Sequence, residues 1–450
     1  MNNTLDMTEG SPVRHIIVFA IPMLIGNLFQ QVYNIVDSII VGQFVGANAL
    51  AAVGVTGSIT FFFFALCNGI GSGGGIITSQ FFGSKDDKLV RSCIANTGYI
   101  MVVFPLVVGI IAFVLAGPLL RVLSTPDNIF NEALNYTRVM CVGLLFVSVY
   151  NYVSSMLRAL GNSKTPLYFL ILSCLLNVVL DLWFVCGFHW GVIGAGWATV
   201  IAQLLAGVVC LIFAFRKNPY FKMSAEDLKI NTSVIWKTIR LGVPLSLQFS
   251  LIAISSMAVQ RVVNSFGAVA VAAFTAGSRI EQLIHQPYQS LSGSLSTYAG
   301  QNYGAKKYNR VLKGYRRSLL IMLGFTVLMV PAMQIWGGAI TSWFVSDPEV
   351  IEMGAKALQI TSLFYVFLGM IYVVRGVLNG VGDAFFALFN GIVEVIGRFT
   401  IPILLTRYTP MGLWGIWWSC GIVWFLSGFT AWLRYLKTYK FLKDNMNESK

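Results

Sequence analysis

Four acidic residues of this sequence, Asp37, Asp181, Glu281 and Glu394, lie inside long apolar segments. If these segments cross a membrane, each charge costs at least about 2.5–3.5 kcal/mol at the centre of the bilayer. An ionisable group that is kept at such a depth generally has a partner or a function. These carboxylates are therefore the first residues to consider for chemistry.

Asp37 is one of four polar residues on a single face of the first apolar segment. The four are Gln30, Tyr33, Asn34 and Asp37, which recur at positions i, i+3, i+4 and i+7 of a helix. Lipid cannot satisfy such a face, so it should point into a bundle of helices. We expect Gln30, Tyr33 and Asn34 to contact a substrate there.

A second polar pair lies in the fifth apolar segment, where Asp181 follows Asn177 by one helical turn. At 1.5 Å per residue, Asp37 lies roughly 34 Å and Asp181 roughly 25 Å beyond the nearest basic residue on the cytoplasmic side. Thr199 lies roughly 8 Å into the sixth segment, counted from the outside. All four residues are thus expected at one level in the outer half of the membrane.

We expect these residues to form an ion-coupling site, made of Asp37, Asn177, Asp181 and Thr199. Their oxygen atoms suit a hard cation such as sodium. Two nearby carboxylates also suit proton binding, because like charges and burial both disfavour ionisation. The pattern leaves sodium and proton open, as well as a polar network that only holds helices together. No other metal ion and no organic cofactor is indicated.

The two remaining carboxylates have different surroundings in the sequence. Arg398 follows Glu394 at i+4 on the same helix, so we expect these two residues to neutralise each other. Glu281 lies at mid-depth in the eighth segment, and His285 at i+4 can face it. We expect Glu281 to meet a cationic substrate.

The composition excludes an ordinary soluble protein. Of the 450 residues, 56% are hydrophobic and 11% are charged, whereas soluble domains carry about 25% charged residues. The net charge is +13, but the basic residues form short clusters between apolar runs. That pattern indicates cytoplasmic loops of a membrane protein rather than a nucleic-acid interface. The seven cysteines all fall in apolar runs without metal-ligand spacing, and no GxxxxGK[ST] motif for ATP is present.

Apolar runs of about 20 residues predict an integral membrane protein with twelve transmembrane helices. Basic residues concentrate in alternate loops, and loop 216–240 alone holds six of them, so both termini and this loop should be cytoplasmic. We expect a multi-pass monomer in the plasma (inner) membrane. The predicted helices cover residues 14–40, 51–78, 92–116, 134–157, 165–187, 194–215, 241–264, 270–298, 318–338, 355–377, 384–406 and 412–434.

The chain contains an internal repeat. A shift of 221 residues aligns Gly46 with Gly267, Gln80–Gly83 with Gln301–Gly304, Gly161 with Gly382, and Gly191, Gly194 and Trp197 with Gly412, Gly415 and Trp418. Six helices per half give both halves the same orientation, related by a pseudo-two-fold axis along the membrane normal. We therefore predict an N-terminal lobe at 1–215, a linker at 216–240 and a C-terminal lobe at 241–450.

Several of these motifs resemble the multidrug and toxic compound extrusion (MATE) transporters. The resemblance extends over nearly the whole chain and is specific in combination. It rests on Ile21–Ser38, Val45–Gly46, Ala51–Gly54, Ser79–Gly83, Arg158–Pro166 and Gly191–Thr199.

The resemblance implies two six-helix lobes, alternating access and export of small organic compounds by antiport with H⁺ or Na⁺. In the branch that resembles the DNA-damage-inducible (DinF-like) transporters, the ion site of the N-lobe matches Asp37, Asn177, Asp181 and Thr199 here, and the proline that bends the first helix matches Pro22. Another bacterial branch places acidic residues on helices seven and ten. Residues 241–264 and 355–377 contain no Asp or Glu, so coupling is expected in the N-lobe.

Other functions remain as alternatives. A lipid-linked oligosaccharide flippase of the same superfamily would carry more helices or a strongly cationic cavity. An intramembrane enzyme would need a catalytic dyad or a metal motif such as HExxH, and the sequence has neither. Fifteen methionines and 33 phenylalanines favour an adaptable site for apolar, amphipathic cations.

Overall fold

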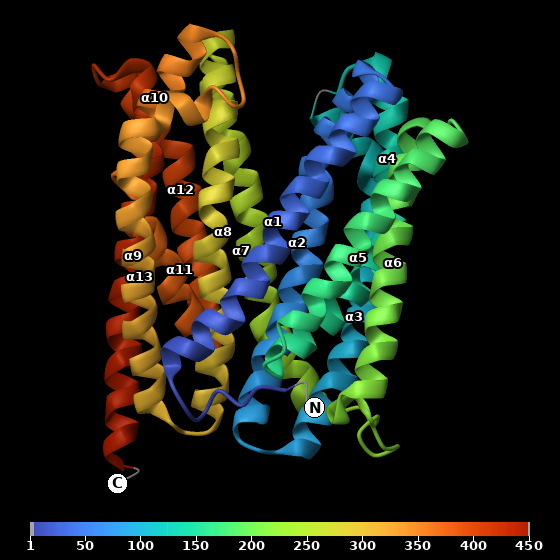
Figure 1. Ribbon diagram of the computed structural model, residues 1–450, viewed down its shortest axis with the longest axis vertical. Coiled ribbons are helices and arrows are strands. Elements are labelled where there is room, and N and C mark those ends of the chain that lie inside the picture. Colours follow the sequence, from blue (N-terminus) through green and yellow to red (C-terminus); the bar gives the residue numbers. More distant parts are fainter. Residues whose placement is uncertain (1–3, 124, 449–450) are drawn as a thin grey trace. The chain divides into compact units, whose positions relative to one another are not determined.

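The computed structural model describes residues 4–123 and 125–448, and the regular elements of this part of the chain are all helices (Figure 1). The first half comprises α1 (Pro12–Phe44), α2 (Ala47–Gly83), α3 (Asp87–Val122), α4 (Asp127–Ala159), α5 (Lys164–Asp181), η1 (Leu182–Gly187) and α6 (Gly191–Lys217). The second comprises η2 (Pro219–Phe221), α7 (Thr232–Asn264), α8 (Ala268–Gly304), α9 (Tyr308–Thr341), α10 (Pro348–Ser362), α11 (Tyr365–Gly380), α12 (Ala384–Tyr408), η3 (Gly412–Trp414) and α13 (Gly415–Glu448).

Twelve of these segments account for the expected transmembrane helices. Ten helices of the described residues are long and apolar enough to span a bilayer. The pair α10 and α11 makes an eleventh span that is bent by 53°. The twelfth is α8, which has 37 residues but is more polar than the others. Each predicted segment lies inside these elements, and most are longer than predicted because helices continue past the apolar core of the membrane.

The predicted repeat is visible in the backbone. Both α2 and α8 have 37 residues and begin after a glycine with positive φ. Positive φ angles recur at four pairs of positions that are 221 residues apart. These pairs are Gly46 (118°) with Gly267 (90°), Lys85 (60°) with Lys306 (56°), Gly161 (84°) with Gly382 (92°), and Gly191 (59°) with Gly412 (53°). The two halves therefore turn the chain at equivalent places and with the same backbone conformation.

The chain forms two compact units, and each is shared between the two halves of the sequence. Unit 1 takes in the chain up to Met7 and residues 21–250, and unit 2 takes in residues 8–20 and the chain from residue 251 onward. The lobes expected from the sequence differ from these units in two places. The start of α1 packs with the second half, and α7, which begins inside the expected linker, packs with the first half up to Ser250.

Specific contacts explain both exchanges. In unit 2, the hydroxyl group of Ser294 on α8 donates a hydrogen bond to the carbonyl oxygen of Ile16 on α1, at 2.7 Å. In unit 1, the hydroxyl group of Ser246 on α7 donates to the carbonyl oxygen of Leu66 on α2. Glycines at positions 69 and 73 of α2 allow this approach, because a Cβ atom on either would lie within 3.0 Å of α7 backbone atoms.

Helix α4 lies at the centre of unit 1 and packs on α2, α3 and α6. Small residues bring the helices close, as is common between membrane helices. A Cβ atom on Gly143 of α4 would lie 2.3 Å from Val200 of α6, and one on Gly207 of α6 would lie 2.9 Å from the backbone of Tyr150. This tight α4–α6 contact fixes the helix that carries Thr199.

Candidate functional site

The carboxyl groups of Asp37 and Asp181 lie within hydrogen-bonding reach of each other in unit 1. Asp37 comes from α1 and is half-buried, whereas Asp181 is the last residue of α5 and is fully buried. Two carboxylates at this separation repel each other when both are ionised. The pair can therefore hold a shared proton, or it can hold a cation that balances both charges.

The chain changes its helical form directly after Asp181. Residues Leu182–Gly187 form η1, a π-helical turn, before the chain turns into α6. Such turns are rare in proteins, but those that do occur are often at functional sites. They shift the side chains that follow relative to their positions in a regular α-helix. Here the π-helical turn packs Val185 into a core formed by α1, α2, α4 and α6, which holds the end of α5 beside α1.

Two hydrogen bonds connect α1 and α5 to the same residue of α6. The hydroxyl oxygen of Tyr33 on α1 lies 3.2 Å from the Thr199 hydroxyl oxygen on α6. The side-chain amide of Asn177 on α5 donates to the same Thr199 oxygen, also at 3.2 Å. Tyr136 on α4 is buried and close enough to interact electrostatically with both aspartates. Four helices thus supply polar side chains to one cluster.

A narrow pocket lies between α1, α5 and α6, beside Asn177 and Thr199. The amide oxygen of Gln203, one turn after Thr199, is buried there without a hydrogen-bond partner among the described residues. An unpartnered buried acceptor is a ready ligand for a cation or a hydrogen-bond donor. The pocket is lined by Tyr33, Ser173, Cys174, Asn177, Thr199 and Gln203.

Five predicted residues lie in this one cluster. Four were expected to form the ion site, and the fifth, Tyr33, was expected to contact substrate. Tyr33 contacts this cluster through Thr199, while Gln30 and Asn34 are exposed on the same helix. Two further residues near the cluster, Tyr136 and Gln203, were not predicted from the sequence. The i+4 spacing from Thr199 to Gln203 was a usable signal, whereas a tyrosine in an apolar helix such as Tyr136 gave none.

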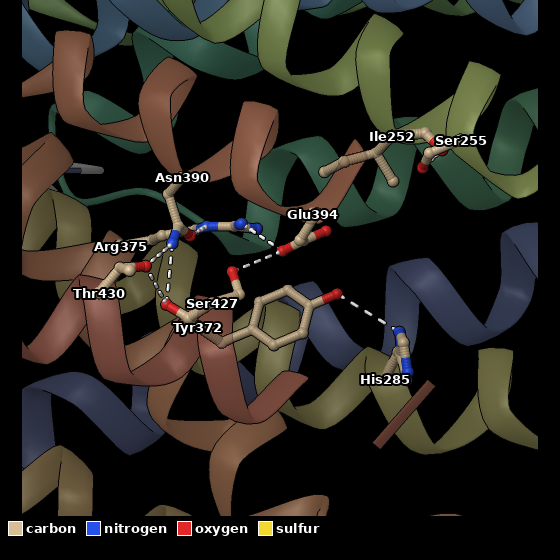
Figure 2. A network of polar contacts seen from close by, with 9 residues as sticks. All are labelled: Ile252, Ser255, His285, Tyr372, Arg375, Asn390, Glu394, Ser427 and Thr430. Carbon is tan, nitrogen blue, oxygen red and sulfur yellow. Dashed lines mark hydrogen bonds and ion pairs between the residues drawn. The ribbon is translucent and has the colours of Figure 1, made fainter. Parts of the chain in front are cut away.

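Unit 2 contains a second polar cluster, which corrects one expectation (Figure 2). Glu394 on α12 forms a buried ion pair with Arg375 on α11, not with Arg398 on its own helix. Arg375 also donates to the side-chain oxygen of Asn390 at 2.7 Å, and Ser427 donates to Glu394 at 3.1 Å. The expected pair is absent because Arg375 reaches both acceptors from a neighbouring helix with the planar geometry that a guanidinium favours.

Glu281 and His285, both on α8, lie near this cluster. His285 Nδ1 is 3.4 Å from the hydroxyl oxygen of Tyr372 on α11 (Figure 2). Its ring also makes an edge contact with Trp424, at a centroid distance of 5.8 Å. Glu281 lies beside the hydroxyl group of Thr361 and within electrostatic range of Arg398. Glu281 therefore lies among polar groups of unit 2.

These features define a polytopic membrane transport protein whose sequence contains two six-helix repeats. A polar cluster lies inside each of the two compact units. The chain belongs to the MatE family, whose model matches residues 22–183 and 244–404, once in each half. Members of this family are transporters and not enzymes.

Curated relatives and solved structures agree with this assignment over the whole chain. "Probable multidrug resistance protein YpnP" of Bacillus subtilis (strain 168) is 29% identical over 432 residues, which is 96% of each chain. "Multidrug export protein MepA" of Staphylococcus haemolyticus (strain JCSC1435) is 23% identical over 425 residues, or 94% of this chain and 93% of that one. A crystal structure of MATE in complex with MaL6 superposes with a TM-score of 0.91 at 22% identity, covering 98% of this chain and 99% of that chain.

Proposed function

We propose that this protein is a secondary active exporter of small organic compounds, which it exchanges for H⁺ or Na⁺. The observation that carries the proposal is the Asp37–Asp181 carboxyl pair between membrane-spanning helices of unit 1. Buried carboxylates in a membrane mark an ion or proton pathway by default. The names of the relatives, which refer to multidrug resistance and multidrug export, support drug-like substrates for this chain as well.

In this proposal, Asp37, Asn177, Asp181 and Thr199 bind the coupling ion, and Tyr33 links that site to α1. No group of three or more His, Cys, Asp or Glu side chains able to hold a metal ion occurs among the described residues. A sodium ion would therefore be held by the two carboxylates together with neutral oxygens, such as those of Thr199 and Asn177. A proton would instead be shared between the carboxylates.

Substrates are proposed to be amphipathic organic cations, with Gln30, Asn34 and Glu281 as contacts. Pro22 lies inside α1, next to the point where this helix passes from unit 2 to unit 1. A proline removes one backbone hydrogen bond and lets a helix bend. We propose Pro22 as a hinge through which the state of Asp37 changes the shape of α1.

The protein is proposed to act as a monomer in the plasma membrane, with both termini and the 216–240 linker in the cytoplasm. The linker carries six basic residues, which favours the cytoplasmic side. Export then carries substrate outward while the coupling ion moves inward down its gradient.

The deciding experiment is transport by purified protein in proteoliposomes, with a proton gradient and a sodium gradient imposed separately. A fluorescent monovalent organic cation serves as the substrate. We expect one of the two gradients to drive transport of the dye against its concentration gradient, and Asp37→Asn protein to lose this transport. Equal transport with and without an imposed ion gradient would contradict the proposed coupling.

A further inference from the structure

The segment between η2 and α7 is held against α3 by hydrogen bonds. This docked segment comprises residues 222–231. The buried side chain of Asn96 on α3 accepts a hydrogen bond from the backbone N–H of the segment's last residue at 2.8 Å, and it donates one to the carbonyl oxygen of Lys229 at 3.2 Å. Further along α3, the hydroxyl group of Tyr99 donates to the carbonyl oxygen of Leu228 at 2.8 Å. These bonds fix how far along α3 the docked segment reaches.

The docked segment reaches the point where α3 begins to expose apolar side chains. Tyr99 is exposed, and the exposed apolar residues that follow it on α3 include Val102, Val103, Leu106, Val107, Ile110 and Ile111. Because α3 is long and apolar enough to span a bilayer, these side chains suit contact with lipid. Leu228 and Ile230 of the docked segment are 46% and 73% exposed, and Trp236 in the second turn of α7 is 66% exposed. Apolar and tryptophan side chains in this position are typical of the boundary between lipid tails and headgroups.

Basic side chains from the start of α3 and from the docked segment lie on the same part of unit 1. The two parts of the chain meet where the hydroxyl group of Tyr220, in η2, donates a hydrogen bond to the carboxylate of Asp87 at 3.0 Å. Lys88 and Arg91 both lie within electrostatic range of Asp227 in the docked segment. The Nε–H group of Arg91 is buried and has no hydrogen-bond partner among the described residues, so it can donate to a bound anion. The exposed basic residues here include Lys88, Lys222 and Lys229.

The acidic residues of this surface are fewer, and most of them bind donors of the protein itself. Asp227 is buried, and its carboxylate accepts hydrogen bonds from the backbone N–H and the hydroxyl group of Ser224, both at 2.8 Å. Asp86 caps α3 by accepting from a backbone N–H of the first turn at 3.0 Å. Residues 84–91 and 216–240 together hold nine basic and four acidic residues. The surface therefore keeps a positive charge, which suits an anionic partner.

We propose that the docked segment and the start of α3 form a binding site for an anionic phospholipid. The headgroup phosphate would bind the basic side chains of Lys88, Arg91 and Lys229, while Leu228 and Ile230 contact the upper part of the acyl chains. Anionic membrane surfaces attract basic residues next to a membrane span, and exposed apolar side chains beside them strengthen binding through burial. The proposal goes beyond the exporter function, because it does not depend on which compound or ion the protein transports.

The first test measures lipid bound to the purified protein by native mass spectrometry, with phosphatidylglycerol and phosphatidylcholine of identical acyl chains. The wild type should bind phosphatidylglycerol more tightly. Each basic residue near an anionic surface contributes about fivefold in affinity. The triple variant Lys88→Gln, Lys222→Gln and Lys229→Gln should therefore weaken phosphatidylglycerol binding by about tenfold or more and leave phosphatidylcholine within about twofold.

The matched control removes three exposed lysines of α13 instead, through Lys437→Gln, Lys440→Gln and Lys443→Gln. This variant loses the same net charge and should bind phosphatidylglycerol within about twofold of the wild type. An equal loss in the two triple variants would show that only net charge matters and would overturn the site. Glycerol phosphate, which has the headgroup chemistry without acyl chains, should not displace the lipid. Displacement by glycerol phosphate would indicate a site for soluble anions and contradict the proposal.

The second test measures the position of the docked segment in lipid nanodiscs. Ile230→Cys protein carries a bimane label, and the lipids carry a nitroxide quencher at the headgroup. The label should be strongly quenched, whereas a label at Lys443→Cys, near the end of α13, should not be. An unquenched label at residue 230 would place the docked segment in water and contradict the proposal. Neither test involves transport, so a protein that binds phosphatidylglycerol at this site but fails to exchange dye for ions would contradict the exporter proposal alone.

Discussion

The hydroxyl group of Tyr33 on α1 lies 3.2 Å from that of Thr199 on α6, and Thr199 also accepts a hydrogen bond from Asn177 on α5. One threonine therefore connects three helices around the carboxylate pair. Any change in the position of α1 must alter the Tyr33 contact or carry Thr199 with it. Substitutions of Tyr33 and Thr199 therefore test most directly whether the proposed ion site is linked to the position of α1.

Replacing Tyr33 with Phe removes only the hydroxyl group that contacts Thr199. A neutral hydrogen bond contributes about 0.5–1.5 kcal/mol, so we expect a loss of roughly twofold to tenfold in apparent affinity for the coupling ion. The measurement is dye transport in proteoliposomes as a function of proton or sodium concentration. Thr199→Val should give a larger defect, because it removes the hydroxyl group that hydrogen-bonds to both Tyr33 and Asn177, while Thr199→Ser should keep most of the activity. Equal behaviour of the Val and Ser variants would rule out this role for the hydroxyl group.

Asp37→Asn is expected to abolish export without lowering the amount of protein in the membrane. Asparagine has nearly the same size but can neither release a proton nor balance the charge of a cation. The measurement is efflux of a fluorescent cation from cells, normalised to expression. Asp127→Asn, which changes an exposed carboxylate at the start of α4, is the control and should export at the wild-type rate. Wild-type efflux from Asp37→Asn cells would show that this carboxylate is not the coupling group.

Arg375→Met should lower the stability of the protein, because it leaves Glu394 charged and buried. Loss of one partner of a buried ion pair costs about 3–5 kcal/mol. The double variant Arg375→Met with Glu394→Leu removes both charges and should recover much of that loss. Thermal unfolding in detergent, followed by the accessibility of buried cysteines to a thiol-reactive dye, provides the measurement. A double variant that is less stable than Arg375→Met would contradict the pairing.

The fold was largely predictable from the sequence, because the features that indicate it extend over long segments of the chain and do not depend on single contacts. Apolar runs of membrane length and the alignment of Gly46 with Gly267 do not depend on which helices touch, and both are confirmed by the structure. The bend between α10 and α11 was missed, since Ser362–Phe364 contains no proline or glycine. The exchange of the first parts of α1 and α7 between units was also missed, because it is decided by tertiary contacts.

The candidate sites were predictable to the extent that helical spacing determined them. Depth along each helix placed Asp37 and Asp181 at one level, and the structure brings these two residues together. The same reasoning paired Glu394 with Arg398 and was wrong, because an i+4 pair on a helix gains only about 0.2–0.5 kcal/mol. A neighbouring helix that offers Arg375 with better geometry readily outweighs so small a local preference.

The orientation of the chain is tested by single cysteines on the two sides of the membrane. Glu226, in the 216–240 linker, and Asn128, near the start of α4, are both exposed. Glu226→Cys should react with an impermeant thiol reagent only after the cells are opened, since basic loops stay in the cytoplasm. Asn128→Cys should react in intact cells. The opposite result for the pair would reverse the proposed topology.

Asp37 and Asp181 are expected to act as a single coupled site. Their carboxyl groups lie within hydrogen-bonding reach, so the charge of each disfavours ionisation of the other. Their protons then dissociate in two steps that belong to the pair. Residues that act as one unit are strongly non-additive. The double variant Asp37→Asn with Asp181→Asn should therefore lose little more transport than either single variant, measured as dye uptake per reconstituted protein. Substantial activity in each single variant, with losses that multiply in the double variant, would show two independent sites. Alternating access follows from the coupled site if occupancy of the pair favours one conformation of α1, because a ligand shifts an equilibrium only through its different affinity for the two states.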